Sequence, residues 1–456
     1  MNAISAEGLG DALFKKNYQL RYAYIAGGMY KGIASRDLVV SMGKAGMLGY
    51  LGTGGMAYDE IDASVRYIQA KLTNDQPYGA NLLCNIESPE IEERTVDLLL
   101  RRGVRFAEAA AYMSITPSLV LWRLKGMRQT ETGAILRPRR VLAKVSRPEV
   151  ATAFMASAPR KILSDLVAAQ KLSPAEALLG ERIPMADEIC VESDSGGHTD
   201  QGVALALLPS MLMLRDEMVR KHKYQTPIHV GAAGGIGTAH AAAAAFIMGA
   251  DFVLTGSINQ CTVEAGTSDT TKSILQDIGV RDTTYAPAGD MFEMGARVQV
   301  VRKGLFFPAR ANRLYELYQR HNSLEEIDMK TREQIQEKYF KRSFADVWEE
   351  TRRYYLRTGA EWIHDIENKP KQKMALIFKW YFVHTTRLAQ SGSEDQRVDY
   401  QIHCGPALGA FNQWVRGTPL QSWQERHVAD IGVQIMNGAA QLLNDRYRTL
   451  LHGGAR

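Results

Sequence analysis

The stretch PIHVGAAGGIGTAHAAAAAFIMGADFVLTGS (227–257) decides the fold. It consists of a short apolar strand (227–231), a glycine-rich loop, an alanine-rich helix (238–249), a second strand (251–255) and another glycine turn. A strand, a helix and a strand in this order predict a parallel βαβ unit, because the helix returns the chain to the starting edge of the sheet. Both glycine turns then lie at the same edge, beside the N-terminus of the helix.

The same alternation runs back to the beginning of the chain. Six earlier segments read as strands, at 22–26, 47–51, 77–83, 104–108, 140–145 and 187–192. Segments with helical spacing separate them, at 35–44, 59–71, 89–102, 117–125 and 201–221, and an additional helix fits around SPAEALLG (173–180). Eight strands alternating with helices predict the α/β class and closure into a TIM (β/α)8 barrel.

After residue 310 the pattern changes. Long segments such as ANRLYELYQRHNSLEEIDMKTREQIQEKYF (311–340) and FADVWEETRRYYLRTGAEWIHDI (344–366) have apolar residues at helical spacing, charges of both signs and little strand character. We therefore expect two domains, a barrel over 1–309 and an additional C-terminal helical domain over 310–456.

The composition excludes several classes of protein. With 45% hydrophobic and 23% charged residues in 456, the chain is typical of a globular protein. The net charge of +5 is too small for a dense nucleic-acid-binding face, although a local patch for an acidic protein partner stays open. No apolar run is long enough for a signal segment or a membrane span, so we expect a cytoplasmic protein. The four cysteines lie far apart, and we expect no metal site.

In such a barrel the functional residues follow the strands, because the loops at the C-terminal face build the active site. Glycines follow the seventh and eighth strands, where backbone N–H groups and a helix N-terminus favour an anion. Tight turns are the structural alternative, which we disfavour because two adjacent loops share the pattern. The candidate residues that follow, end or, for Asn81, lie within these strands are Gly27, Gly28, Met29, Thr53, Asn81, Glu108, Lys144, Glu192, Gly196, Gly197, His198, Gly234, Gly235, Gly256 and Ser257.

Two of these side chains carry candidate chemistry. Lys144 ends an otherwise apolar strand and could stabilise an anionic cofactor, or could form a structural ion pair with Glu108 or Glu192; the sequence favours neither. His198 follows two glycines and could present a proton to a ligand near neutral pH, or could simply cap a loop.

Several motifs resemble one family of enzymes. Gly27-Gly28-Met29, KAGMLGYLGTGG (44–55), ESDSGGHTD (192–200) and HVGAAGGIGT (229–238) resemble the nitronate monooxygenase superfamily of FMN-dependent TIM barrels, which includes flavin-type enoyl reductases. LFFPARANRLYELY (305–318), KPKQKMALIFKWYF (369–382) and YQIHCGPALGAFNQWVRGTPL (400–420) are similar to the PfaD family. Its members are stand-alone enoyl reductases of polyunsaturated fatty acid synthases and trans-acyltransferase polyketide synthases. The resemblance covers essentially the whole chain.

The resemblance implies the site residues and cofactors. FMN would bind with its phosphate at Gly234, Gly235, Gly256 and Ser257, with Gly27, Gly28 and Met29 against the flavin. Asn81 and Lys144 would contact its ring or ribityl chain. Thr53, Glu192, Gly196 and Gly197 complete the predicted cofactor-binding set. His198 and Lys144 are the candidate catalytic residues, since His198 matches the histidine of the superfamily's G-G-H motif.

The resemblance also implies the reaction, the reduction of a 2-enoyl thioester on an acyl carrier protein by NADPH through FMN. The alternatives are a nitronate monooxygenase and a flavin-retaining, non-catalytic component of a synthase. We expect a carrier protein as partner and the region after 310 as its docking surface and as a cover for the active site. The candidate docking residues are Arg310, Arg313, Arg352 and Arg353. The oligomeric state is left open, with a homodimer as one alternative.

Overall fold

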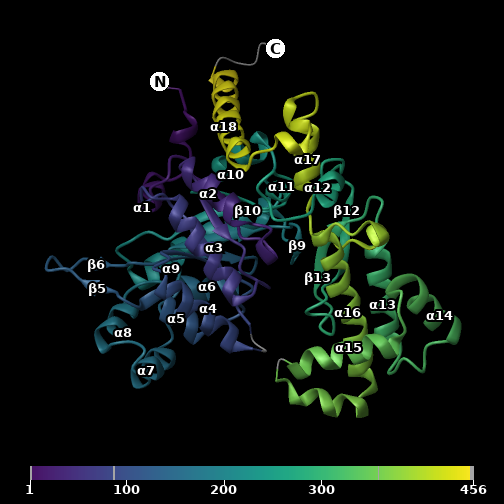
Figure 1. Ribbon diagram of the computed structural model, residues 1–456. Coiled ribbons are helices and arrows are strands. Elements are labelled where there is room, and N and C mark those ends of the chain that lie inside the picture. Colours follow the sequence, from purple (N-terminus) through teal and green to yellow (C-terminus); the bar gives the residue numbers. More distant parts are fainter. Residues whose placement is uncertain (1–2, 86–87, 358, 452–456) are drawn as a thin grey trace. The chain divides into compact units, whose positions relative to one another are not determined.

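Eight parallel strands close into a barrel in the order β1-β11-β10-β8-β7-β4-β3-β2. Helices surround these strands (Figure 1). The computed structural model describes residues 3–85, 88–357 and 359–451. The barrel strands are β1 (Tyr24–Ala26), β2 (Leu48–Leu51), β3 (Gly79–Leu83), β4 (Phe106–Ala110), β7 (Arg140–Val145), β8 (Glu188–Glu192), β10 (His229–Ala233) and β11 (Val253–Thr255). Each of the eight overlaps its predicted segment, although β4 and β10 begin and end two residues later than predicted, and the TIM-barrel prediction is confirmed.

Helices connect the barrel strands, and they begin at the caps expected from the sequence. Ser35 caps α2, and its hydroxyl accepts the N–H of Leu38, while Thr238 caps α10 in the same way. A two-stranded hairpin, β5 (Arg128–Gln129) and β6 (Ile135–Leu136), precedes β7. The helices of this part are α1 (Ala12–Tyr18), α2 (Arg36–Lys44), α3 (Tyr58–Lys71), α4 (Pro89–Arg101), α5 (Pro117–Leu124), α6 (Pro148–Met155), α7 (Arg160–Ala168), α8 (Pro174–Gly180), α9 (Ala204–His222), α10 (Ala239–Ile247) and α11 (Ser257–Gln260).

Helix α1 covers the end of the barrel at which the strands begin. Phe14 and Tyr18 are buried in one apolar cluster with barrel residues such as Ile25 and Leu142. The Tyr18 hydroxyl donates to the carboxylate of Glu188, the first residue of β8. A ligand therefore has to approach the barrel strands from their opposite, C-terminal ends, where the candidate residues lie.

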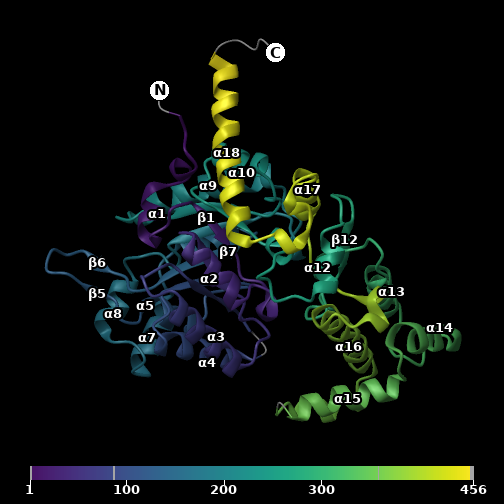
Figure 2. The ribbon, with the colours of Figure 1, turned by 45° about the horizontal axis from the view of Figure 1, so that its top comes forward.

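The last helix of the chain, α18 (Val428–Leu451), belongs to the barrel. It runs alongside α10 in both views (Figures 1 and 2). The contact is close, because a Cβ on Gly438 would lie 2.7 Å from the Cβ of Ala239. A Cβ on Gly432 would lie 2.9 Å from the sulfur of Met47, so both glycines permit the helix to pack.

A second unit contains an antiparallel sheet and further helices. The sheet has the order β12-β13-β9, with β12 (Thr283–Pro287), β13 (Arg297–Val301) and β9 (Gly197–His198). Phe292 lies at the centre of its core, with edge-on or tilted rings of Tyr315, Tyr318, Phe378 and Phe382 around it. The helices are α12 (Asp269–Leu275), α13 (Phe307–Arg320), α14 (Met329–Gln334), α15 (Phe344–Arg357), α16 (Pro370–Ser391) and α17 (Pro406–Trp414), with a π-helix at Ile335–Phe340.

The chain divides at other points than the predicted boundary at 309/310. The barrel unit comprises Met1–Asp194, Asp200–Gly266 and Gln413–Arg456, and the second unit comprises Ser195–Thr199 and Thr267–Asn412. The predicted C-terminal helices are present. The reason for the different division is packing: Val298 and Val300 of β13 share a core with Phe378 and Phe382 of α16. Among the described residues, no helix combines the length and the apolarity that crossing a membrane requires.

Candidate active site

Lys144 lies between two carboxylates at the C-terminal ends of three neighbouring strands. Its Nζ is 3.1 Å from Glu192 Oε1 on β8 and 4.0 Å from Glu108 Oε1 on β4. Burial lowers the pKa of Lys144, but Glu192 and Glu108 outweigh this effect, so the pKa lies above its ordinary value. Lys144 is therefore a fixed cation. It forms the structural ion pair that the sequence analysis gave as one alternative, beside the stabilisation of an anionic cofactor.

Glu108 connects the other predicted residues of the barrel. This side chain is fully buried, and its Oε2 accepts the N–H of Gly28 at 2.6 Å and the Nδ2–H of Asn81 at 3.2 Å. The hydroxyl of Thr53 donates to the backbone oxygen of Asn81 at 2.6 Å. Glycine is needed at position 28, because a Cβ there would lie 2.6 Å from Glu108 Oε2. Glu108 thus brings Gly28, Asn81 and Lys144 together.

Glu108 was absent from the predicted cofactor-binding set. The sequence places Glu108 at the end of the fourth predicted strand, where functional residues are expected. Its negative charge suggested only an ion pair with Lys144. Burial raises the pKa of Glu108, although Lys144 and the N–H donors oppose this effect. Its Oε1 has no hydrogen-bond donor among the described residues, so this buried acceptor faces Lys144 alone at 4.0 Å.

The two glycine loops after β10 and β11 leave open space. Gly234 and Gly235 adopt φ values of +82° and +74°, which favour glycine. A Cβ on Gly234 would lie 2.4 Å from the backbone oxygen of Ser193, whereas one on Gly235 or Gly256 would meet no atom of the described chain within 4 Å. Gly234 therefore serves packing, and Gly235 and Gly256 line space that a ligand could fill.

His198 lies in the second unit, on the short strand β9. Its backbone pairs with Val298 of β13, and its Nε2 lies 2.9 Å from Asp290 Oδ1. Burial would raise the pKa of Asp290, but the hydrogen bond with His198 and the charge of the imidazole hold it below its ordinary value. Sequence reasoning missed Asp290, because 92 residues separate it from His198.

A second histidine lies beside this pair. Burial, together with the positive charge of His198, lowers the pKa of His403 to about 4. The Nε2 of His403 is 2.7 Å from the side-chain nitrogen of Gln401, which donates to it. His403 is therefore neutral near pH 7, while His198 has a carboxylate partner.

Gly196 and Gly197 are part of the same small sheet rather than of the barrel unit. A Cβ on Gly196 would lie 2.7 Å from the Cα of Cys404, and Gly197 has a φ of +87°. Residues Ser195–Thr199 belong to the second unit, and the chain belongs to the barrel unit on either side of them. A hydrogen bond of 2.8 Å from the N–H of Asp194 to the backbone oxygen of Gly202 joins the two flanking segments. Packing within the second unit thus accounts for both glycines, and their predicted contact with a cofactor stays a prediction.

Three of the four predicted docking arginines have partners within the second unit. Arg310 is largely buried and pairs with the buried Asp399. Arg313 pairs with Glu316 at 3.3 Å, and Arg352 lies 3.7 Å from Glu349. Arg353 is exposed. Arg310 is unsuitable for docking, because its guanidinium balances a buried carboxylate.

Comparison with known proteins identifies the family. The family model described as nitronate monooxygenase matches residues 13–303, which include all eight barrel strands. The chain belongs to the nitronate monooxygenase family. A second model, the inserted helical domain of [acyl-carrier-protein] S-malonyltransferase, matches residues 321–400.

This member of the nitronate monooxygenase family has relatives among biosynthetic synthases. It is 55% identical over 98% of its length to the polyketide biosynthesis protein PksE of Bacillus subtilis. It is also 40% identical over 95% of its length to a polyunsaturated fatty acid synthase component of Thraustochytrium sp.. The chain spans 58% and 29% of these two proteins.

A solved structure matches nearly end to end. The enoyl reductase domain of MlnA, from the macrolactin biosynthesis cluster of Bacillus amyloliquefaciens, is 44% identical, with a TM-score of 0.94 over 97% of this chain and 99% of that chain. The resemblance predicted from the motifs is confirmed. The chain is a homologue of an enoyl reductase domain and of polyketide and fatty acid synthase components, within an oxidoreductase family.

Proposed function

We propose that this protein reduces the 2,3 double bond of enoyl thioesters on an acyl carrier protein, with NADPH as reductant and FMN as cofactor. The observation that carries the proposal is the match to the MlnA enoyl reductase domain, which extends through both units and leaves almost none of either chain unmatched. The similarity to PksE and to the fatty acid synthase component supports a role in polyketide or fatty acid biosynthesis.

The residues at the C-terminal ends of the strands fit FMN. Gly235 and Gly256 border open space, and the N-terminus of α10 with its backbone N–H groups favours a phosphate. We infer that Gly234, Gly235, Gly256 and Ser257 hold the phosphate, and that Gly27, Gly28, Met29, Thr53, Asn81, Lys144 and Glu192 surround the ring and ribityl chain. When bound, FMN supplies a two-electron relay between NADPH and the carbon–carbon double bond.

Lys144 provides a permanent positive charge beside the proposed ring site. Glu192 and Glu108 keep the ammonium protonated, and Glu108 also fixes Gly28 and Asn81 through its Oε2. A fixed cation stabilises negative charge that develops during reduction without reorganising at that moment. We assign Lys144 to this electrostatic role and Glu108 to positioning.

Reduction of the double bond takes one hydride at the β-carbon and one proton at the α-carbon. We infer that His198 donates this proton, or hydrogen-bonds to the thioester carbonyl, with Asp290 orienting the imidazole and stabilising its charged form. Bulk water is the competing proton source. The neutral His403 cannot replace His198 as an acid near pH 7, since its pKa is about 4.

The second candidate function is nitronate oxidation, which the family model over residues 13–303 favours. That reaction would use the same barrel, with His198 as a base. We prefer the reductase, because the second unit extends far beyond residue 303 and a small free substrate needs no docking surface.

One assay separates the candidates. We expect the FMN-loaded protein to oxidise NADPH rapidly when crotonyl carrier protein is added, under argon as well as in air. Oxidation of a nitroalkane anion with consumption of oxygen would identify a nitronate monooxygenase. Flavin binding with no turnover of either substrate would identify a non-catalytic synthase component. A protein that releases FAD, or no flavin, on denaturation contradicts the cofactor assignment.

A further inference from the structure

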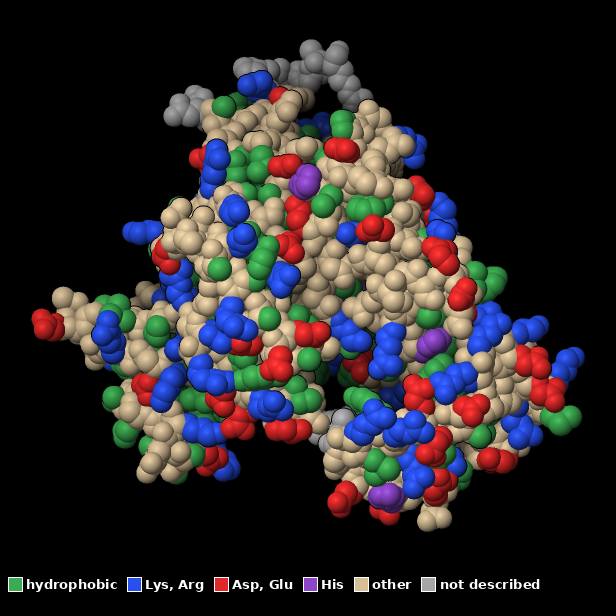
Figure 3. All heavy atoms as spheres, viewed as in Figure 1, with side chains coloured by type: hydrophobic (Ala, Val, Ile, Leu, Met, Phe, Trp, Pro, Cys, Tyr) green, Lys and Arg blue, Asp and Glu red, His purple; other side chains and the backbone are tan. Residues whose placement is uncertain are grey.

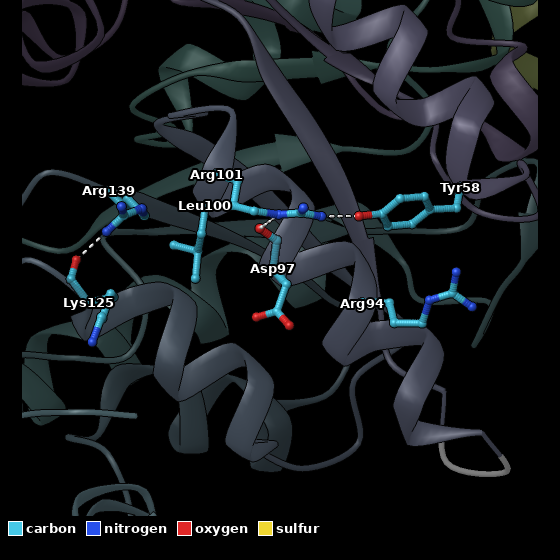
Figure 4. Close-up of a pocket in the computed structure, with 7 residues that line it drawn as sticks. All are labelled: Tyr58, Arg94, Asp97, Leu100, Arg101, Lys125 and Arg139. Atoms are coloured by element: carbon cyan, nitrogen blue, oxygen red, sulfur yellow. Dashed lines mark hydrogen bonds between the residues drawn. The ribbon is translucent and has the colours of Figure 1, made fainter. Parts of the chain in front are cut away.

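The pocket on the outer flank of the barrel unit is lined by polar side chains that already have partners (Figure 4). Arg101 donates to the hydroxyl of Tyr58 and interacts with the carboxylate of Asp62. Arg139 donates to a backbone oxygen and interacts with the carboxylate of Glu176. These cations are compensated within the chain, so the pocket offers no unused charge to a ligand.

His403, beside His198, is a titratable side chain that the proposed proton transfer does not use. Some histidines lie on the surface (purple in Figure 3), but His403 is half-buried in the second unit. Its backbone forms an antiparallel bridge with Val300, two residues along β13 from Val298, which pairs with His198. Residues paired at this spacing project from the same face of a sheet. His198 and His403 therefore share one face, and their imidazoles interact electrostatically.

The side chain of Gln401 fixes the position of the ring proton of His403. Its amide nitrogen donates to Nε2 of His403 at 2.7 Å, and its amide oxygen accepts from the hydroxyl of Thr385 at 3.4 Å. The amide is thus held with its nitrogen toward the imidazole. Because Nε2 accepts a hydrogen bond and the imidazole is neutral near pH 7, the ring proton is on Nδ1.

The Nδ1 atom of His403 borders open space beside Gly197. A Cβ on Gly197 would lie 3.6 Å from Nδ1, and outside the adjoining residues no other atom of the described chain would lie within 4 Å of it. Among the described residues, no acceptor forms a hydrogen bond with Nδ1. The lack of a side chain at Gly197 therefore leaves room for a ligand oxygen next to an N–H donor.

We propose that His403 donates an Nδ1–H hydrogen bond to the thioester oxygen of the enoyl substrate, while His198 supplies the proton. This inference rests on the proposed function and adds a catalytic residue that binds the substrate carbonyl.

The two histidines would act on different atoms of the substrate. When the β-carbon receives the hydride that NADPH supplies through the cofactor, the electrons of the carbon–carbon double bond move toward the carbonyl, and negative charge develops on the thioester oxygen. The Nδ1–H donor stabilises this charge, and a neutral imidazole does so without giving up its proton. The α-carbon then takes the proton of the His198 imidazolium, and the carbonyl double bond is restored.

The test compares three variants of the full-length, FMN-loaded protein. His403→Phe removes the donor and keeps a ring, whereas His403→Asn keeps a side-chain N–H donor near the position of Nδ1. His384→Phe is the matched control, because His384 is also half-buried in the second unit and also bonds a glutamine, Gln396, at 2.8 Å. Stopped-flow kinetics measures the two half-reactions. Infrared spectroscopy measures the carbonyl stretch of a crotonyl-pantetheine thioester bound without NADPH.

We expect His403→Phe to slow the half-reaction with the enoyl thioester by at least about 100-fold, and His403→Asn to recover at least about tenfold of this loss. Reduction by NADPH in both variants, and both half-reactions in His384→Phe, should stay within about twofold. On binding, the carbonyl stretch should move to lower frequency in the wild type and in His198→Ala, but not in His403→Phe. A shift that persists in His403→Phe, or equal slowing of both half-reactions, would overturn the assignment.

A measurement without turnover separates this inference from the proposed function. In protein labelled with nitrogen-15 histidine, NMR should show that the His403 ring is neutral near pH 7 and carries its proton on Nδ1, with His403→Phe identifying the signal. A charged ring, or a proton on Nε2, would overturn the inference. If the wild type reduces no enoyl thioester but shows a carbonyl shift that His403→Phe removes, the proposed reaction fails and the hydrogen bond stands. A wild type that binds no thioester overturns both.

Discussion

At the scale of single residues, the roles of the two acids that organise the candidate site did not follow from the motifs. Glu108 bonds Gly28 and Asn81 and faces Lys144, and Asp290 bonds His198. Strand ends and glycine patterns predicted the positions of Gly28, Asn81, Lys144 and His198. Glu108 and Glu192 were named from the sequence as possible partners of Lys144. The hydrogen bonds of Glu108 with Gly28 and Asn81, and of Asp290 with His198, could not be predicted, because bonds between distant segments depend on packing rather than on local sequence.

Asp290→Asn tests the role of the His198–Asp290 pair. Asparagine keeps the size of the side chain and loses the charge that stabilises a protonated imidazole. We expect the half-reaction with crotonyl carrier protein to slow by about tenfold, and His198→Ala to slow it by about 100-fold, while reduction by NADPH changes little in either. Stopped-flow measurement of the two half-reactions checks this. Asp346→Asn, in the same unit, serves as control; equal slowing of both half-reactions would assign the pair a structural role.

His403 makes the stability of the second unit depend on pH. Its pKa in the folded protein is about 4, below the ordinary value near 6.5, so the unfolded chain binds more protons between these values. Stability should therefore fall as the pH is lowered from about 6.5 to about 4, by up to about 3 kcal/mol. Denaturant unfolding at several pH values measures this, and His403→Gln should flatten the dependence. An unchanged slope in that variant would assign the pH dependence to other groups.

At the scale of elements, local patterns were sufficient for the barrel. Caps such as Ser35 and Thr238, and short apolar runs between helices, located all eight strands. The antiparallel sheet of the second unit was not predicted. Its strand β9 has two residues, Gly197 and His198, and is held by pairing with Val298 and Gln299 of β13. A strand this short leaves no periodic signal in the sequence.

The loop between β10 and α10 gives a prediction at this scale. Gly235→Asp places a carboxylate in open space where the phosphate of FMN is proposed to bind, so the purified variant should contain at least about tenfold less FMN. Gly304→Asp is the matched control, because Gly304 also has a positive φ, +69°, and open space around it. Flavin content after denaturation, measured by absorbance and chromatography, decides the outcome. Full FMN content in Gly235→Asp would exclude the phosphate from this loop.

At the scale of the whole molecule, the chain contributes to the second unit twice. Ser195–Thr199 branches from the loop after β8, whereas Thr267–Asn412 forms the rest before the chain returns to the barrel as α18. The sequence does not show that the chain returns to the barrel unit near residue 413, because α16 of the second unit and α18 of the barrel unit have the same helical spacing of apolar residues. The same organisation places the histidine of the G-G-H motif in one unit and Lys144 in the other.

The central claim is that this protein saturates a carrier-bound enoyl group, and the mass of the carrier protein tests it most directly. Crotonyl carrier protein incubated with NADPH and the FMN-loaded protein should gain two hydrogen atoms and become butyryl carrier protein. It should stay unchanged without NADPH and with His198→Ala at short reaction times. A crotonyl carrier protein of unchanged mass, in a reaction where the flavin is reduced by NADPH, would contradict the account.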